Sequence, residues 1–267
     1  MLKIMIDEII YDLNVPYGIC PFDLVKDNLI NCRAKEKLPQ NSKSIIVFLF
    51  PYKFEDNKYV NSNISKYACV KDYHIVINDA LSPVIDRLKT KFPENKFVSF
   101  SDNSPIPEVT AAVYAGLGVK GKNNLLINSF FGSYVFIGEI VTDLELEYNE
   151  FNLKSCINCG ACIAECPKQA ISENGINKDK CLSNIIQSKG EISEQDILLI
   201  KDNNCLWGCD ICQDICPMNT EIKINPFNGF LNGFENRLRC DGDISDRAYA
   251  WRGNKIVKRN YDIERMK

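Results

Sequence analysis

The chain contains 267 residues, of which 45% are apolar and 25% are charged, and its formal net charge is −3. These values are typical of a soluble globular protein with a sizeable core, and they exclude a polycationic nucleic-acid-binding chain. The first residues lack the apolar core and the cleavage site of a signal peptide, and no apolar run approaches the ~18 residues that span a bilayer. We therefore expect a cytoplasmic protein without a membrane segment. Its 13 cysteines then indicate metal binding or catalysis rather than disulfides.

Residues 1–150 contain only three cysteines and combine strand and helix patterns, which predicts a mixed α/β (α+β) domain. The β-branched run at residues 44–50 is typical of a strand that is buried on both faces. Glycines at positions 116 and 118 are expected to end the second helix. In chain order, the predicted elements are a strand at 44–50, a helix at 74–92, a strand at 96–100, a helix at 107–115 and a strand at 132–140.

Cysteine content divides the rest of the chain. Residues 151–222 hold nine cysteines with short apolar stretches between them, and they form the second expected domain. Residues 223–267 have few long apolar patterns and become basic, so we expect a separate C-terminal segment there.

Two cysteine runs in the second domain have the spacing of bacterial ferredoxins. A C-x2-C-x2-C loop places three thiolates around one face of a four-iron cluster, and the cysteine that precedes a proline ligates the other cluster. Zinc also accepts four thiolates, but the x3-Cys-Pro ending belongs to the ferredoxin pattern. The spacing therefore predicts two [4Fe–4S] clusters. The first run is Cys156, Cys159, Cys162 and Cys166, and the second is Cys209, Cys212 and Cys216.

Crosswise pairing assigns seven of the eight ligands and leaves one position open. Cys205 lies four residues before Cys209, close to the position that a symmetric ferredoxin fills, and spacing favours it. Cys181 lies farther away, after a stretch long enough to loop back, and it remains an alternative on spacing alone. The first cluster is expected to bind Cys156, Cys159, Cys162 and Cys216, and the second Cys166, Cys209, Cys212 and the eighth ligand.

The string GCDICQDICPMN at residues 208–219, together with SCINCGACIAECPKQAI at residues 155–171, resembles the epoxyqueuosine reductase family. ISKYACVKDYH at residues 64–74 and the stretches at 101–127 and 132–146 are similar to further segments of that family. The resemblance covers about residues 40–260. It implies a cobalamin-dependent enzyme with two [4Fe–4S] clusters, related to the reductive dehalogenases. Its cobalamin-binding N-terminal domain would be followed by a ferredoxin-like domain.

The resemblance also implies roles for individual residues. It points to Cys181, in a CLS string, as the eighth cluster ligand in place of Cys205. The family's proton donor matches Asp102, and its active-site histidine matches His74, the only histidine of the chain. As a general acid, Asp102 would need a raised pKa from burial against the corrin. Corrin contacts are implied at Ser65, Asp102, Leu126, Ile137, Ser183, Cys209 and Asp210.

The activity implied by the resemblance is reduction of epoxyqueuosine to queuosine in the anticodon loop of tRNA. An external low-potential donor would supply the electrons to a monomeric enzyme. A basic stretch near the C-terminus, interleaved with Tyr249 and Trp251, suits contact with phosphates and bases, but it is equally typical of a solvated helix face. The basic residues are Arg247, Arg252, Lys255, Lys258 and Arg259.

Three departures from the family pattern bear on the substrate. Val109 replaces an arginine, and Asn103 and Ser104 replace a Thr-Gly pair. The chain ends at Lys267, where full-length members continue into a helical-repeat domain, so we expect a short form. A cobalamin enzyme that reduces a small molecule is one alternative. The other is a ferredoxin-like electron-transfer protein, which would not need the domain at residues 1–150.

Overall fold

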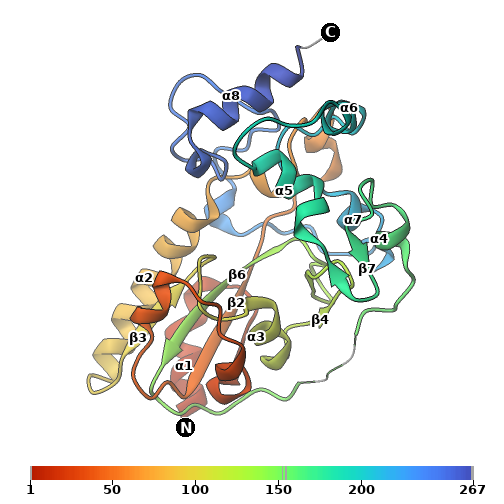
Figure 1. Cartoon of the computed structure of the whole chain (residues 1–267). Helices are drawn as coiled ribbons and strands as arrows, with labels where there is room; N and C mark the ends of the chain where they lie inside the picture. The colour runs from red at the N-terminus through yellow and green to blue at the C-terminus, as the bar shows by residue number, and fades with distance from the viewer. Residues whose placement is uncertain (1, 152, 154, 266–267) are drawn as a thin grey trace.

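A computed structural model of the chain describes residues 2–151, 153 and 155–265. Its centre is an antiparallel four-stranded sheet in the order β1-β2-β6-β3, formed entirely within the N-terminal region (Figure 1). No helix among the described residues combines the length and the apolar character needed to cross a membrane. The sheet consists of β1 (Tyr17–Pro21), β2 (Ser44–Pro51), β6 (Val135–Thr142) and β3 (Phe97–Phe100).

The two faces of β2 belong to two separate hydrophobic cores. Ile46, Phe48 and Phe50 pack with α1 (Leu2–Ile10) and α2 (Tyr73–Lys91), whereas Ile45, Val47 and Leu49 face α3 (Glu108–Tyr114). All eight residues of the strand are buried, because side chains alternate across a sheet that is covered on both faces. The predicted strand at 44–50 is thus confirmed, although its neighbours are antiparallel.

The other predicted elements of this region are also confirmed, with shifted ends. α2 and α3 occupy the two predicted helices, and Gly116, at φ 75°, follows the end of α3. β6 begins three residues later than expected, because Asn128 and Gly132 pair in a tight turn before it. Sequence patterns missed α1 and β1.

The second half of the chain is built from short elements on irregular backbone (Figure 1). The small β4–β5 hairpin of the N-terminal region, Val119–Lys120 with Leu126–Ile127, lies beside the first cysteine run through a bridge between Lys120 and Ser155. The hairpin β7–β8, Ile171–Ser172 with Gly175–Ile176, follows that run. The helices are α4 (Ala161–Ala164), α5 (Leu182–Gln187), α6 (Glu194–Asp202), α7 (Ile211–Asp214) and α8 (Asn254–Ile263).

A third hydrophobic core joins all three predicted regions. Ile64 comes from the N-terminal region, Trp207 from the cysteine-rich region and Val257 from α8, and all three side chains are buried in this core. Ile64 also pairs with Trp207 through a parallel backbone bridge. The C-terminal segment is therefore packed into the body of the protein, and the predicted division at residues 150 and 222 remains a prediction about chain organisation.

Candidate functional site

His74 and Asp102 lie side by side, although the sequence separates them. Asp72 caps the start of α2, and its Oδ1 accepts the backbone N–H of His74 at 3.0 Å and faces ring Nδ1 at 2.7 Å. Ring Nε2 of His74 faces Oδ2 of Asp102 at 3.3 Å. Both ring nitrogens therefore meet carboxylates, an arrangement that favours the doubly protonated imidazolium.

This geometry places the proton on His74. Burial lowers the pKa of His74, but the hydrogen bonds with Asp102 and Asp72 outweigh it and raise the pKa to about 9. The hydrogen bond with His74 is the largest influence on Asp102, and it lowers the pKa of that carboxyl to about 2 against the effect of burial. The raised pKa that we expected for Asp102 is thus absent in this geometry, because 59% of its side chain is exposed and its partners stabilise the anion.

Tyr73 completes this group, although no sequence pattern assigns it a role. Its hydroxyl donates to Oδ2 of Asp102 at 2.9 Å. Its ring stacks on His74 at a centroid distance of 4.1 Å and on Phe136 of β6 at 4.3 Å. The stack holds the histidine ring close to β6 of the sheet. The only local signal for Tyr73 was its place before the histidine in the DYH string.

The four cysteines assigned to the first cluster surround one cavity between the two cysteine runs. The cavity is lined by Cys156, Cys159, Cys162 and Cys216, together with Gly121 and Asn123 of the N-terminal region. Within the described residues, no three His, Cys, Asp or Glu side chains converge as ligands of one metal ion do. Four cysteine thiols around one cavity, too far apart to hold a single metal ion, fit a four-iron cluster bound through thiolates.

The second set of thiols, Cys166, Cys181, Cys209 and Cys212, also consists of neighbouring side chains. Burial, followed by the charge of neighbours that include Cys181 and Cys166, raises the pKa of Cys209 to about 11. Burial and the nearby Cys209 and Cys181 likewise raise the pKa of Cys212 to about 12. Cys166 also accepts the backbone N–H of Ala170 on its sulfur at 3.2 Å. The four thiols are thus close enough to act on one another, as ligands of a shared cluster must.

Cys205 lies near the second set but faces another way. Its sulfur is buried and is within 2.9 Å of the carbonyl oxygen of Gly208 and 3.6 Å of that of Trp207. The charge of Cys209 acts on Cys205, whereas the thiols that act on Cys212 include Cys209 and Cys181. The geometry therefore favours Cys181 over Cys205 as the eighth ligand.

Part of the expected corrin contact set is gathered at the junction of the two domains. Ser65, Cys209 and Asp210 line one cavity, and the hydroxyl of Ser65 is buried without a hydrogen-bond partner. A Cβ on Gly208, which has a φ of 77°, would lie 2.0 Å from that hydroxyl oxygen. An unpartnered buried hydroxyl beside a backbone that only glycine fits is compatible with a bound ligand.

The remaining expected contacts lie on separate elements. Leu126 is buried in β5, and Ile137 is half-buried in β6, next to the Phe136 stack. Ser183 is half-buried on α5, where its hydroxyl accepts the side-chain amide of Gln187 at 3.1 Å. The residues present fit a corrin between the sheet edge and the cluster domain, and the individual contacts remain predictions.

A buried polar network fixes the second cysteine run to the sheet. Oδ1 of Asn219 accepts the backbone N–H of Ser133 at 2.8 Å, and its amide donates to the Gln213 carbonyl and the Ser133 hydroxyl. The Gln213 amide donates to the Ser133 carbonyl at 3.0 Å. Lys66 adds an ion pair to Asp214 at 2.6 Å. Sequence reasoning assigned none of these positions, although Gln213 and Asn219 stand inside the GCDICQDICPMN string.

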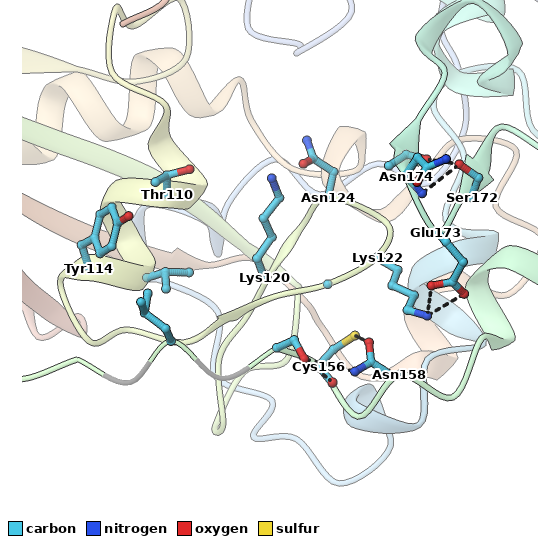
Figure 2. Close-up of a pocket in the computed structure, with 15 residues that line it drawn as sticks. Thr110, Tyr114, Lys120, Lys122, Asn124, Cys156, Asn158, Ser172, Glu173 and Asn174 are labelled. Carbon is cyan, nitrogen blue, oxygen red and sulfur yellow. Dashed lines mark hydrogen bonds and ion pairs between the residues drawn. The ribbon is translucent and has the colours of Figure 1, made fainter. Parts of the chain in front are cut away.

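An open pocket of about 470 Å³ adjoins the first cysteine run (Figure 2). Lys120 points into it from β4, and Lys122 pairs with Glu173 of the β7–β8 turn at 2.5 Å. Cys156 lines the pocket beside Asn158. The pocket therefore gives a polar approach to the expected first cluster.

The basic C-terminal residues divide into internal and exposed groups, which corrects the expectation that all five face solvent or RNA. Arg247 is buried and pairs with Glu235 at 3.0 Å. Arg259 donates to the carbonyl oxygens of residues 186, 188 and 190 at the end of α5. Both arginines are held by internal acceptors, and a residue pattern cannot distinguish such acceptors from phosphates. Trp251 and Lys255 are exposed, and the half-buried Arg252 has its guanidinium 3.8 Å from the Trp251 ring centroid.

Two family models match the chain. The model described as "Epoxyqueuosine reductase QueG, DUF1730" matches residues 33–103, and the "4Fe-4S double cluster binding domain" matches residues 155–219. The epoxyqueuosine reductase of Cyclobacterium marinum is 38% identical over 229 residues, which cover 84% of this chain and 72% of that protein. The chain spans from 43% to 72% of the length of the curated relatives considered.

Solved structures share the fold. An epoxyqueuosine reductase with a tRNA-Tyr epoxyqueuosine-modified stem loop has a TM-score of 0.81 at 24% identity, covering 98% of this chain and 80% of that one. The Bacillus subtilis epoxyqueuosine reductase, solved with its catalytic aspartate loop swung out of the active site, has a TM-score of 0.77 at 22% identity, with the same coverage. A reductive dehalogenase, whose structure suggests a mechanism for B12-dependent dehalogenation, has a TM-score of 0.51 at 16% identity, covering 98% and 35%.

Proposed function

Because the chain belongs to the epoxyqueuosine reductase family, we propose that it reduces epoxyqueuosine to queuosine in tRNA, with two [4Fe–4S] clusters and cobalamin as cofactors. The observation that carries this proposal is the His74–Asp102 pair, which offers a proton beside the expected cofactor site. A ferredoxin-like carrier has no use for such a pair.

Removal of an epoxide oxygen as water, with formation of an alkene, consumes two electrons and two protons. The two clusters, ligated as the thiol sets above indicate with Cys181 in the second, each carry one electron at a time. Cobalamin, when bound, supplies a low-potential cobalt centre that delivers electrons to the epoxide carbon. An external low-potential donor refills the clusters. Cys159 is the exposed member of the first set, so we assign electron entry to that cluster.

Solvent water supplies one of the two protons, and the protein's own contribution is the other. In the open site His74 holds it, and Asp102 is an anion stabilised by Tyr73 and His74. A corrin and a substrate over this loop would exclude water from Asp102, which raises the pKa of a carboxyl. The proton then passes from Nε2 of His74 to Oδ2 of Asp102 and on to the departing oxygen. Asp102 is thus the proton donor and His74 its source.

Binding of tRNA is proposed to use the exposed part of the C-terminal segment. The exposed Trp251 ring stacks with the half-buried Arg252, and Lys255 and Lys258 lie on the solvent side of α8. Planar groups with neighbouring cations suit stacking on bases and contact with phosphates. Arg247 and Arg259 are left out of this surface because their guanidinium groups are engaged inside the protein.

The test uses anaerobically reconstituted protein with an epoxyqueuosine-containing anticodon stem-loop and a chemical reductant. We expect conversion to queuosine, and binding that weakens steeply with salt, by up to ~0.9 in log–log slope for each phosphate neutralised. Changing Arg252 and Lys255 to Ser should flatten that slope. Changing Lys89 and Lys91 to Ser, at the far end of α2, is the matched control and should leave it unchanged. Retained cobalamin without tRNA binding or conversion would instead indicate a small-molecule reductase, in line with Val109.

A further inference from the structure

Two carboxyl groups, Glu108, which is half-buried, and Glu139, which is fully buried, anchor the loop that carries Asp102 (residues 101–104, the Asp102 loop). Glu108, at the start of α3, accepts the backbone N–H of Asp102 on Oε1 at 2.9 Å. Glu139 of β6 is fully buried, and its Oε2 accepts the Ser104 hydroxyl at 2.8 Å. Its other oxygen, Oε1, is buried without a partner. A fully buried carboxylate with a free oxygen is costly, so this site favours a protonated carboxyl.

The charges around the pair reinforce this preference. Burial first, and then the charge of Asp102, raises the pKa of Glu108 to about 7, and His74 opposes the shift. Burial and the neighbouring Glu108 raise the pKa of Glu139 well above its usual value. The charge of Glu139 also acts on Cys20 of β1, and that of Glu108 acts on Tyr73, and neither a thiol nor a phenol carries positive charge. Among the described groups that act on the pair, His74 alone is cationic.

The loop itself needs an anchor. Asp102 and Asn103 have φ values of 53° and 40°, in the left-handed region that non-glycine residues rarely adopt. Strained backbone of this kind persists only where its surroundings hold it. Glu108 and Glu139 hold the loop through the backbone N–H of Asp102 and the hydroxyl of Ser104.

We propose that Glu108 and Glu139 are positioning residues, and that a proton retained on one of these two carboxyl groups keeps the Asp102 loop against the sheet with Asp102 in reach of His74. Loss of the proton leaves two carboxylates that repel each other and the Asp102 carboxylate. The loop then moves away and the proton path from His74 is broken. The swung-out aspartate loop of the Bacillus subtilis relative shows that a loop of this kind has a second position in that protein.

The first test needs no turnover and works on the purified chain. Between pH 6 and 8, below the pKa of His74, we expect a protonated-carboxyl C=O band in the infrared spectrum to fade. Over the same range, amide exchange of residues 101–105, corrected for its intrinsic rate, should rise by at least about tenfold. Glu139→Gln should remove the band and keep the loop protected at pH 8, because an amide does not ionise and its oxygen still accepts from Ser104. Glu145→Gln, which alters an exposed carboxyl beyond β6, should behave like the wild type.

The second test rests on the proposed function. Under single turnover, the wild-type rate constant for conversion should fall as pH rises from 6 to 8, with little change in the affinity for substrate. Glu139→Gln should abolish that fall. Absence of turnover at every pH would refute the proposed function but leave the infrared and exchange results to decide on the pair. A wild-type protein without a protonated-carboxyl band at pH 6, or with loop exchange that does not depend on pH, would overturn the inference. If Glu139→Gln does not fold, the pH dependence of loop exchange in the wild type still decides, because burial raises the pKa of Asp210 to about 6 and that carboxyl also contributes to the infrared band.

Discussion

Replacing Asp102 with Asn should lower the pKa of the His74 imidazole by about one unit, from about 9 to about 8. Hydrogen bonds with Asp102 and Asp72 raise that pKa against burial. A hydrogen bond to a charged group contributes ~1.5–3 kcal/mol, which corresponds to about 1–2 pKa units. Because 59% of the Asp102 side chain is exposed, solvent screening places the effect at the lower end. Asp72, at 2.7 Å from Nδ1, retains the rest of the shift.

The chain is well suited to this measurement because it contains a single histidine. Histidine labelled selectively with ¹⁵N gives one imidazole to follow through a pH titration of the oxidised protein. Asp12→Asn, which removes an exposed carboxylate bound to Arg87, is the matched control and should leave the titration unchanged. The same variant pair tests catalysis: Asp102→Asn should keep both clusters and cobalamin but lose ~10²-fold or more in turnover, as expected for loss of a general acid.

The sign of the linked stability follows from the direction of the shift. His74 has a raised pKa in the folded state, so its contribution is fully present below its ordinary pKa of 6.5 and is lost as pH rises through about 9. In Asp102→Asn the loss over that interval should be smaller, by about 1 kcal/mol. An imidazole pKa that Asp102→Asn does not change would refute the ion-pair reasoning. Near-normal single-turnover rates would remove Asp102 from the mechanism.

Three further predictions concern the frame of the site. Cys181→Ala should lower the iron content clearly, while Cys205→Ala should leave it unchanged, because the Cys205 sulfur faces the Gly208 carbonyl; the reverse result would place Cys205 on the cluster. Asn219→Ala should lower the apparent Tm by roughly 5 °C or more, since it leaves buried groups of the Ser133 network unpaired, and an unchanged Tm would contradict that role. Arg259→Ala should destabilise the chain in a thermal scan and leave the salt dependence of tRNA binding unchanged, whereas a flattened slope at normal stability would return Arg259 to the RNA surface.

The sheet shows how far local patterns carry a prediction. The strand at 44–50 and the helix at 74–92 were found because each has an uninterrupted apolar or helical pattern within its own residues. β1 escaped because its five residues include a glycine and a proline, and its strand character comes from pairing with β2. The order β1-β2-β6-β3 joins segments far apart in the chain, and no local pattern contains that pairing.

The proton site shows the limit more sharply. Resemblance identified His74 and Asp102, but the protonation of the pair depends on distances that only the fold sets. Glu139 carries a sequence signal for a special role that no prediction used. It is the one acidic residue inside the apolar run VFIGEIVT, and a charged residue in a buried strand calls for an explanation. Conversely, the charge pattern of the C-terminal segment overstated its exposed surface, because a sequence does not show which arginines meet carbonyl oxygens inside the protein.

The segment at residues 64–74 explains why the electron and proton parts of the site depend on each other. At its start, the Ser65 N–H donates to the Trp207 carbonyl, and the Lys66 N–H donates to Asp210, next to the proposed cluster ligand Cys209. At its end, Asp72 orients His74 toward the Asp102 loop. A shift of the second cysteine run would therefore be passed along a short, hydrogen-bonded stretch to the proton source. The second cysteine run and the His74–Asp102 pair are thus held in one fixed arrangement. The geometry of proton delivery should therefore be lost whenever the second cluster is lost.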